Sequence, residues 1–326
     1  MGDISITGIG VISPLGMGRE VFWENVRKAK TGIRKITSFD TRSFTSNVAA
    51  RVEDFDPRLF MPSRIYRRMS RVSRMAVAAS QEALEDSGLV LDDVDRGRIG
   101  VILGTCYGGG SHVEDFYASL LRDGPRGAQP FLFPETVPNA AASHIAMYHG
   151  ITGPNSTFCQ NAISAENAIL YARNLLLQKA VDAVMVGGAD ELSAIQYACY
   201  NALGALNPVR AENDEPVRPR PGRGLILGEG AGVMVMERLD SAQKRDAEIY
   251  GKLTSAVIAG GKAALGHYEV EGEQVARAMN LAIEQAGMEP GEIDQVHVSA
   301  NYSGELDRME YEQIKKVFPK HPEEQP

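Results

Sequence analysis

Short runs of aliphatic and β-branched residues recur along the chain, separated by longer segments with a helical spacing of apolar positions. These runs predict six strands, at residues 4–9, 99–103, 183–186, 232–237, 252–259 and 295–299. Strands that alternate with helices are typical of mainly parallel sheets whose faces are covered by helices. The pattern therefore predicts an α/β protein.

Three segments show the pattern of helices. Residues 70–87 carry an apolar stripe, and Gly88 follows as a stop signal. Residues 161–179 carry small and apolar side chains around much of the helix circumference, which predicts a buried helix. A last helix is expected over residues 307–318, before an end that is polar and rich in proline.

The composition is that of an ordinary globular protein large enough for two core-sized units, with 326 residues, 44% hydrophobic and 23% charged. The 34 basic and 42 acidic residues give a net charge of −8, which argues against a general nucleic-acid-binding protein. No apolar run reaches the roughly 18 to 20 residues that span a bilayer, and no secretory signal pattern opens the chain. We therefore expect a cytoplasmic protein without a membrane span.

Neither the cysteines nor the glycines indicate metal or nucleotide chemistry. Cys106, Cys159 and Cys199 are far apart, lack the Cys-x-x-Cys spacing of metal sites, and are expected to be buried reduced thiols. The glycine-rich segments at residues 8–10 and 228–232 lack the features of a dinucleotide turn and of a P-loop. The sequence predicts no metal site and no cofactor bound by the chain itself.

Residues 153–165, with the sequence GPNSTFCQNAISA, resemble the nucleophile turn of a β-ketoacyl-acyl carrier protein synthase. Counting forward from Gly153, or back from Gly187, places the reactive cysteine of that family on Ala162. Further motifs follow in family order at residues 4–16, 67–71, 207–208, 218–219 and 228–233. The chain thus resembles the thiolase-like condensing enzymes along nearly its whole length.

This resemblance implies a thiolase-like layered αβαβα fold built from two related α/β halves. Residues 1–250 would form the N-terminal half with the nucleophile turn, and residues 251–326 only part of the C-terminal half. A sheet that stopped there would leave an unpaired edge. Either the chain is abridged or truncated, or another chain completes the surface, so the sequence leaves open whether Pro326 is the native end.

In the family resembled here, a cysteine carries the acyl group as a thioester, and two histidines stabilise the developing charges. Ala162 cannot form a thioester. Residues 298–304 resemble the strand end that carries the first histidine, and Asn301 stands in its place, where it can donate a hydrogen bond but cannot titrate. The second histidine belongs to a region that this chain lacks. The six histidines present are expected to be structural or exposed.

Cys159 lies three residues before Ala162 and is a candidate for a displaced nucleophile. Its position belongs to the strand that leads into the turn, away from the helix N-terminus that lowers a thiol pKa, so a packed thiol is expected instead. A deliberate Cys-to-Ala change would also explain Ala162. Because it would not explain Asn301, natural loss of the nucleophile is the more economical hypothesis.

The densest basic run of the sequence includes Arg64, Arg67, Arg68 and Arg71, which would share one face at helical spacing. Such a run is often only a solvated helix face. The alternative is a docking site for an acyl carrier protein, because the matching region of related synthases docks this acidic partner. The phosphopantetheine group would then be carried by the partner.

The function that the resemblance implies is that of a catalytically impaired, ketosynthase-like subunit, similar in role to a chain length factor. It would pair with a complete ketosynthase as a heterodimer in fatty-acid or polyketide elongation and shape the acyl tunnel, with residues 134–152 and the helix after Ala162 at the interface. One alternative is an active β-ketoacyl synthase, a homodimeric acyltransferase seen in a Cys-to-Ala or truncated form. Another is a non-enzymatic acyl-binding scaffold.

Overall fold

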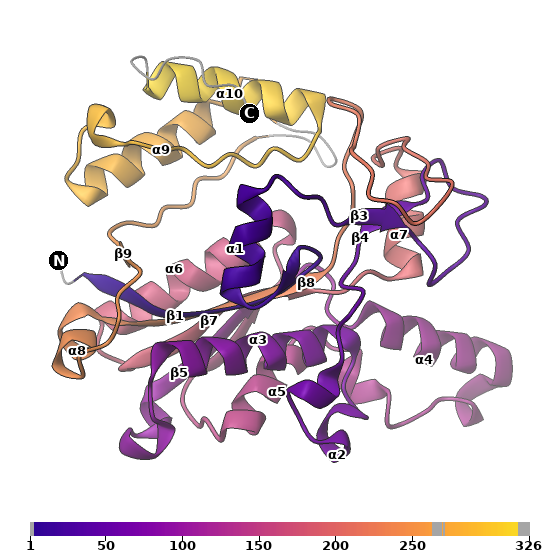
Figure 1. Cartoon of the computed structure of the whole chain (residues 1–326), viewed down its shortest axis with the longest axis horizontal. Coiled ribbons are helices and arrows are strands. Elements are labelled where there is room, and N and C mark those ends of the chain that lie inside the picture. Colours follow the sequence, from indigo (N-terminus) through magenta and orange to yellow (C-terminus); the bar gives the residue numbers. More distant parts are fainter. Residues whose placement is uncertain (1–2, 263–268, 270, 319–326) are drawn as a thin grey trace.

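The computed structural model describes residues 3–262, 269 and 271–318. Its centre is a mixed sheet in which seven of the described strands take part, in the order β2-β1-β8-β7-β5-β6, with β9 also paired to β1 (Figure 1). Strands β5, β6 and β7 run parallel, whereas β8 is antiparallel to both β7 and β1. The strands are β1 (Ile4–Ser13), β2 (Gly16–Met17), β5 (Ile99–Gly104), β6 (Asn155–Phe158), β7 (Ala183–Asp190), β8 (Gly230–Arg238) and β9 (Gly251–Leu253).

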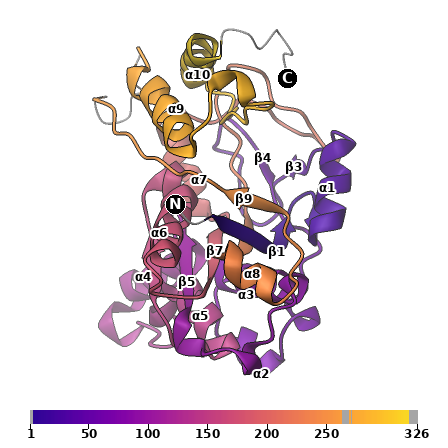
Figure 2. The ribbon, with the colours of Figure 1, turned by 90° about the vertical axis from the view of Figure 1, so that its left-hand side faces the viewer.

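Helices cover both faces of this sheet. Helices α3 (Arg71–Ser87) and α5 (Ala140–His149) pack on one face, and α6 (Ser164–Leu177) packs on the other (Figure 2). Successive strand residues alternate between the two cores, as Val101 faces α3 and Ile102 faces α6. Helix α3 lies so close to β1 that a Cβ atom on Gly10 would come within 1.9 Å of the Ala79 carbonyl oxygen.

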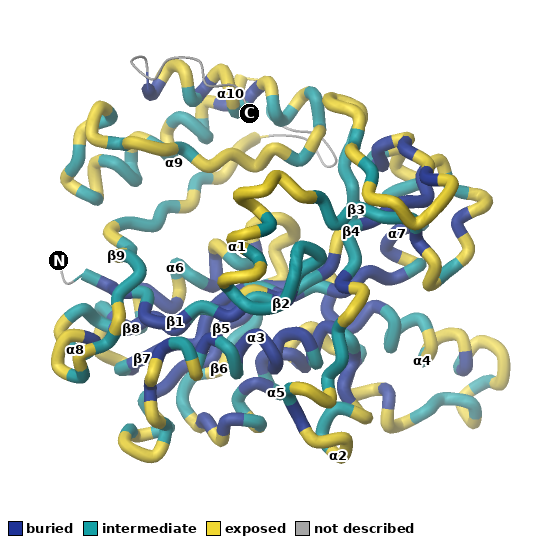
Figure 3. Tube along the Cα trace, viewed as in Figure 1, coloured by how far each residue is buried: buried dark blue, intermediate teal, exposed yellow. Residues whose placement is uncertain are grey.

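The remaining elements surround this core. A hairpin of β3 (Ile33–Lys35) and β4 (Val48–Ala50) lies beside α7 in the view of Figure 1. Helices α9 and α10 lie together above α6 in that view, and Figure 3 shows them largely half-buried or exposed, in contrast to the dark core of the sheet. The other helices are α1 (Arg19–Arg27), α2 (Ser63–Tyr66), α4 (Gly110–Asp123), α7 (Ala194–Ala202), α8 (Leu239–Lys244), α9 (Glu273–Ala286) and α10 (Gly304–Val317).

The helix predicted over residues 70–87 is confirmed as α3. Ser70 is its N-cap in extended conformation, and its hydroxyl accepts the Ser73 N–H at 3.4 Å. Gly88 ends the helix in the left-handed region, with φ of 62°. The helix predicted over residues 307–318 begins slightly earlier, at Gly304.

Two strand predictions were wrong. The run at 252–259 contributes only to the short strand β9, which pairs with β1 in the central sheet. Residues 295–299 form no strand. A strand needs a neighbour to pair its backbone groups. Of the described strands, none pairs with residues 294–300, which are mostly exposed. The sheet is also mixed rather than mainly parallel, since β1 and β8 return antiparallel to their neighbours.

Helix α6 is not buried all round, as its composition had indicated. Ala168, Ala172 and Leu176 are fully buried against the sheet, whereas Tyr171 on another side of the helix is 38% exposed. The segment after β9 contacts another side of this helix, where the Thr254 carbonyl accepts a hydrogen bond from the buried Arg173 at 2.9 Å. No described helix is long and apolar enough to cross a membrane.

Candidate functional site

The site begins with a tight turn between β6 and α6. After Cys159, residues Asn161–Ile163 form a single 3₁₀ turn, and Asn161 has a positive φ of 55°. The Ser164 hydroxyl closes this turn by accepting the Gln160 N–H at 2.9 Å and donating to the Asn161 carbonyl at 2.7 Å. Ala162 is therefore held at the N-terminal end of α6, where it is exposed.

The end of strand β5 fixes the same turn from the other side. A Cβ atom on Gly104 would come within 2.3 Å of the Ser164 carbonyl carbon, so only glycine permits this approach. Beyond Gly104, the Asp190 carboxylate accepts hydrogen bonds from the Thr105 hydroxyl at 2.8 Å and the Cys106 N–H at 2.9 Å. Burial raises the pKa of Asp190, although these donors oppose the shift.

Ala162 lies where two cavities meet. The smaller, of about 250 Å³, extends behind it between the ends of β5, β7 and β8 and is lined by Cys106, Asp190, Glu229 and several glycines. The larger, of about 1070 Å³, opens toward α10. Its walls include Gln160, Asn161, Ala162, Ile163, Tyr200, Leu225, Asn301, Ser303, Glu305, and two arginines, Arg223 and Arg308.

Asn301 lines the same large cavity as Ala162, so the fold brings together the two positions at which the sequence predicts the cysteine and the first histidine of the family. The Asn301 side-chain oxygen accepts the Ser303 N–H at 2.9 Å, which fixes the start of α10. Next to it, the Tyr302 carbonyl accepts the Gly224 N–H at 3.0 Å and ties this loop to the loop before β8.

The thiols near Ala162 are not placed as predicted. Cys106 is half-buried, and Cys159 and Cys199 are exposed, so the expectation of buried thiols was wrong. Cys159 follows directly after β6, where the chain leaves the sheet for the turn. Burial, with Asp190 adding to it, raises the pKa of Cys106 to about 12 and also raises that of Cys159. Both sulfurs are therefore protonated near neutral pH.

No histidine among the described residues lines either cavity that contains Ala162. His149 is buried beside the Ser80 hydroxyl, 2.9 Å from its Nε2, and burial lowers its pKa to about 4. His144 pairs with the buried Glu135 carboxylate. These two histidines are structural, as predicted, while His267 and His321 lie outside the described residues.

The predicted arginine face is divided. Helix α2 ends at Tyr66 and α3 begins at Arg71, so the four arginines do not share one helix. Arg71 instead turns inward and donates to the buried Glu229 carboxylate, with Nη2 2.7 Å from Oε1. Arg64, Arg67 and Arg68 are exposed. Docking of a carrier protein stays a prediction for these three alone.

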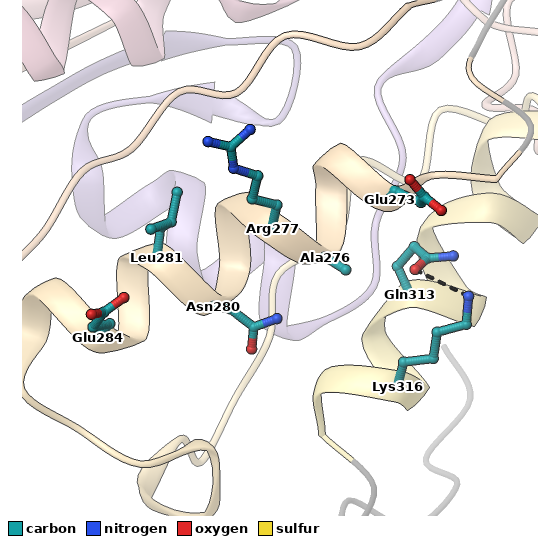
Figure 4. Close-up of a pocket in the computed structure, with 8 residues that line it drawn as sticks. All are labelled: Glu273, Ala276, Arg277, Asn280, Leu281, Glu284, Gln313 and Lys316. Atoms are coloured by element: carbon teal, nitrogen blue, oxygen red, sulfur yellow. Dashed lines mark hydrogen bonds between the residues drawn. The ribbon is translucent and has the colours of Figure 1, made fainter.

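Sequence reasoning missed Arg223 and Arg308, which contribute positive charge to the larger cavity. A signal was present, because Arg218, Arg220 and Arg223 form a second dense basic run. A further open cavity of about 510 Å³ lies between α9 and α10, away from Ala162 (Figure 4). Its walls mix acidic and basic side chains, among them Glu273, Arg277, Glu284 and Lys316.

Comparison with known proteins agrees with this geometry. Residues 1–242 match the family described as "Beta-ketoacyl synthase, N-terminal domain", and residues 250–326 match "Beta-ketoacyl synthase, C-terminal domain". The 3-oxoacyl-(acyl-carrier-protein) synthase 2 of Coxiella burnetii is 32% identical over 324 residues, which cover 98% of this chain and 78% of that protein. The synthase of the same name from Staphylococcus aureus is 31% identical over 319 residues, or 97% and 77% of the two chains.

Solved structures give the same result for the fold. The ishigamide ketosynthase/chain length factor superposes with a TM-score of 0.87 at 28% identity, covering 98% of this chain and 79% of that one. A β-ketoacyl synthase from Burkholderia phymatum gives a TM-score of 0.83 at 27% identity, covering 98% and 78%. The predicted thiolase-like fold is confirmed, and the chain belongs to the β-ketoacyl synthase family.

Proposed function

We propose that this chain is a ketosynthase-like subunit without condensing activity of its own. It pairs with a complete β-ketoacyl synthase in fatty-acid or polyketide elongation and contributes the wall of an acyl tunnel. The observation that carries the proposal is Ala162, which stands at the meeting point of two cavities at the start of α6. A thiolate at this position would be stabilised by the positive N-terminal end of the α6 dipole, whereas the uncharged methyl group of alanine is not.

The neighbouring side chains do not replace the missing nucleophile. Thioester formation needs a thiolate, and the raised pKa of Cys106 and Cys159 keeps both sulfurs protonated at neutral pH. Asn301 can donate a hydrogen bond to an acyl carbonyl but cannot exchange a proton with it. The cavity thus retains space and polarity for an acyl thioester, while its described walls lack the groups that would activate one.

A partner subunit is supported by the side of the chain around β6. Among the described strands β6 pairs only with β5, so its other edge is open. Exposed apolar side chains lie on the elements next to β6, namely Met147 on α5, Tyr171 on α6, and Ile163 in the turn before α6. The similarity to the ishigamide ketosynthase/chain length factor favours a paired ketosynthase as the occupant of this side.

An acyl carrier protein is the expected second partner. Arg64, Arg67 and Arg68 present three exposed cations with no carboxylate of the described residues in ion-pair distance. Acidic carriers are steered by such a surface. The phosphopantetheine arm and its acyl group would then arrive attached to that partner, and the chain itself would need no bound cofactor.

Co-expression with the complete ketosynthase of the same genome tests the proposal. Light scattering reports whether a one-to-one complex forms, and intact mass after incubation with acylated carrier protein reports which chain carries the acyl group. We expect a heterodimer labelled only on the ketosynthase. A homodimer that acquires a thioester on one of its own cysteines would overturn the proposal in favour of a working enzyme.

The Ala162→Cys variant separates the two alternatives that remain. If the chain is an enzyme that lacks only its cysteine, the variant should form a thioester and also gain condensing activity. On our proposal it gains the thioester without condensation, because no histidine of the described residues lines the cavities. A non-enzymatic scaffold without a ketosynthase partner would give no heterodimer with either form.

A further inference from the structure

The chain after β9 has the sequence of a strand but lacks the hydrogen bonds of one. Residues 254–259, with the sequence TSAVIA, continue from β9 toward α9 without forming a helix or a turn (Figure 1). Thr254, Val257 and Ile258 are β-branched, as is usual in strands. Among the described residues, however, no backbone N–H or carbonyl group of residues 255–259 has a hydrogen-bond partner. This segment is therefore open to pairing with another strand.

Arg173 on α6 lies against the same segment and lacks a counter-ion. The residue is only 6% exposed, and its Nη2 donates to the Thr254 carbonyl at 2.9 Å. Its Nε is buried without a hydrogen-bond partner, and no carboxylate of the described residues lies within ion-pair distance of the guanidinium group. A buried charge without a partner is strongly unfavourable. This position therefore favours the arrival of a carboxylate.

The two observations describe one partner. A strand that paired with residues 254–259 would lie about 4.8 Å from them. Because the Arg173 guanidinium group already contacts the Thr254 carbonyl, a side chain of the added strand can reach it. An acidic residue on that strand would supply the anion that Arg173 lacks, while the backbone of the strand would pair the open groups of the segment.

We propose that residues 254–259 and Arg173 form a docking site for an extended, acidic segment of a separate polypeptide, which adds a strand here and pairs its carboxylate with Arg173. Strand addition takes its affinity from backbone hydrogen bonds and its specificity from side-chain contacts. A second copy of this chain does not fit, because the described edge strands β2, β3, β4, β6 and β9 carry no acidic residue. The inference goes beyond the proposed function and does not depend on it.

Two synthetic peptides test the site on the full-length chain. One is a seven-residue peptide in which a central glutamate is flanked by alternating threonine and valine, and the other has glutamine in place of the glutamate. Calorimetric titration should show that the acidic peptide binds about tenfold more tightly, with a difference that shrinks as salt is added. Equal affinities, or no binding of either peptide, would overturn the proposal.

Variants of the chain assign the effect to Arg173. In Arg173→Leu, the acidic peptide should bind no more tightly than the glutamine peptide. The variant should also unfold at the same or a higher urea concentration than the wild type, because it removes a buried charge without a partner. A strongly destabilised Arg173→Leu protein would mean that Arg173 has a counter-ion in the isolated chain, which contradicts the proposal.

Lys252→Gln is the matched control, since Lys252 is an exposed cation on β9, two residues before Thr254. This variant should keep the preference for the acidic peptide. A loss as large as in Arg173→Leu would mean a general attraction between charges and would count against a specific site.

Hydrogen exchange locates the added strand. The backbone amides of residues 255–259 should exchange quickly in the isolated chain and become protected when the acidic peptide is bound. Protection at β6 instead, or protection that rises with the concentration of the chain alone, would contradict the proposal by identifying another edge or a second copy. Since no ketosynthase is present in these measurements, a negative result leaves the proposed heterodimer standing, and failure to form that heterodimer leaves this site standing.

Discussion

Arg71 and Glu229 form an ion pair that joins the first residue of α3 to the loop before β8, 158 positions later in the chain. The Glu229 side chain is fully buried and also accepts the Val52 N–H at 3.0 Å. This carboxylate therefore connects three separate segments at the edge of the cavity behind Ala162.

Replacing Glu229 by glutamine should lower the free energy of unfolding by about 2 to 4 kcal/mol, because the Arg71 cation would lose its carboxylate in a largely buried setting. Urea denaturation measures the change. Asp40→Asn is the control, since the Asp40–Arg42 pair is exposed and should leave the stability unchanged. A Glu229→Gln protein as stable as the wild type would contradict this account of the pair.

Arg67 and Arg71 should separate docking from stability. Arg67→Glu reverses an exposed charge and should weaken carrier binding on the order of fivefold without changing the melting temperature. Arg71→Gln should lower the melting temperature, because Arg71 is tied to Glu229. Surface plasmon resonance at two salt concentrations and thermal unfolding measure the two effects. If the affinity for the carrier protein is unchanged in Arg67→Glu, the docking prediction is wrong.

His149 should make the protein less stable in mild acid. Its pKa is lowered from 6.5 to about 4 by burial, with Arg96 adding to the shift. Between these two pH values His149 is therefore protonated in the unfolded chain but neutral in the folded one. Stability therefore falls as the pH drops from about 6.5 toward 4, by about 3 kcal/mol in total. Urea titrations between pH 7 and 4.5 should show this slope, and His149→Gln should flatten it. An unchanged slope in the variant would assign the effect elsewhere.

Cys106 should react slowly with iodoacetamide at neutral pH, because burial and the nearby Asp190 raise its pKa to about 12. The labelling rate, followed by peptide mass spectrometry, should rise about tenfold for each pH unit between 7 and 9. Asp190→Asn should accelerate it by removing the negative charge. Fast labelling of Cys106 at pH 7 would show a stabilised thiolate and reopen the question of a nucleophile beside Ala162.

The sequence predicted those helices and strands whose formation depends on interactions between residues close together in the chain. The apolar stripe of residues 70–87, with Ser70 before it and Gly88 after it, specifies α3 because helix periodicity and caps act within a few residues. The β-branched run after Ala183 likewise predicts β7. The same logic failed at residues 295–299, where the run is suitable for a strand but none of the described strands pairs with it.

The sequence by itself determined the family, through motifs in a fixed order, and it predicts that Ala162 stands at the position of that family's cysteine. Only the tertiary structure decided that Asn301 shares a cavity with Ala162, that Arg71 points inward to Glu229, and that Arg223 lines the same cavity as Arg308. These pairs are separated by more than 80 residues. Their proximity follows from how the sheet, α6 and α10 pack, and no local pattern of side chains encodes a distance of that kind.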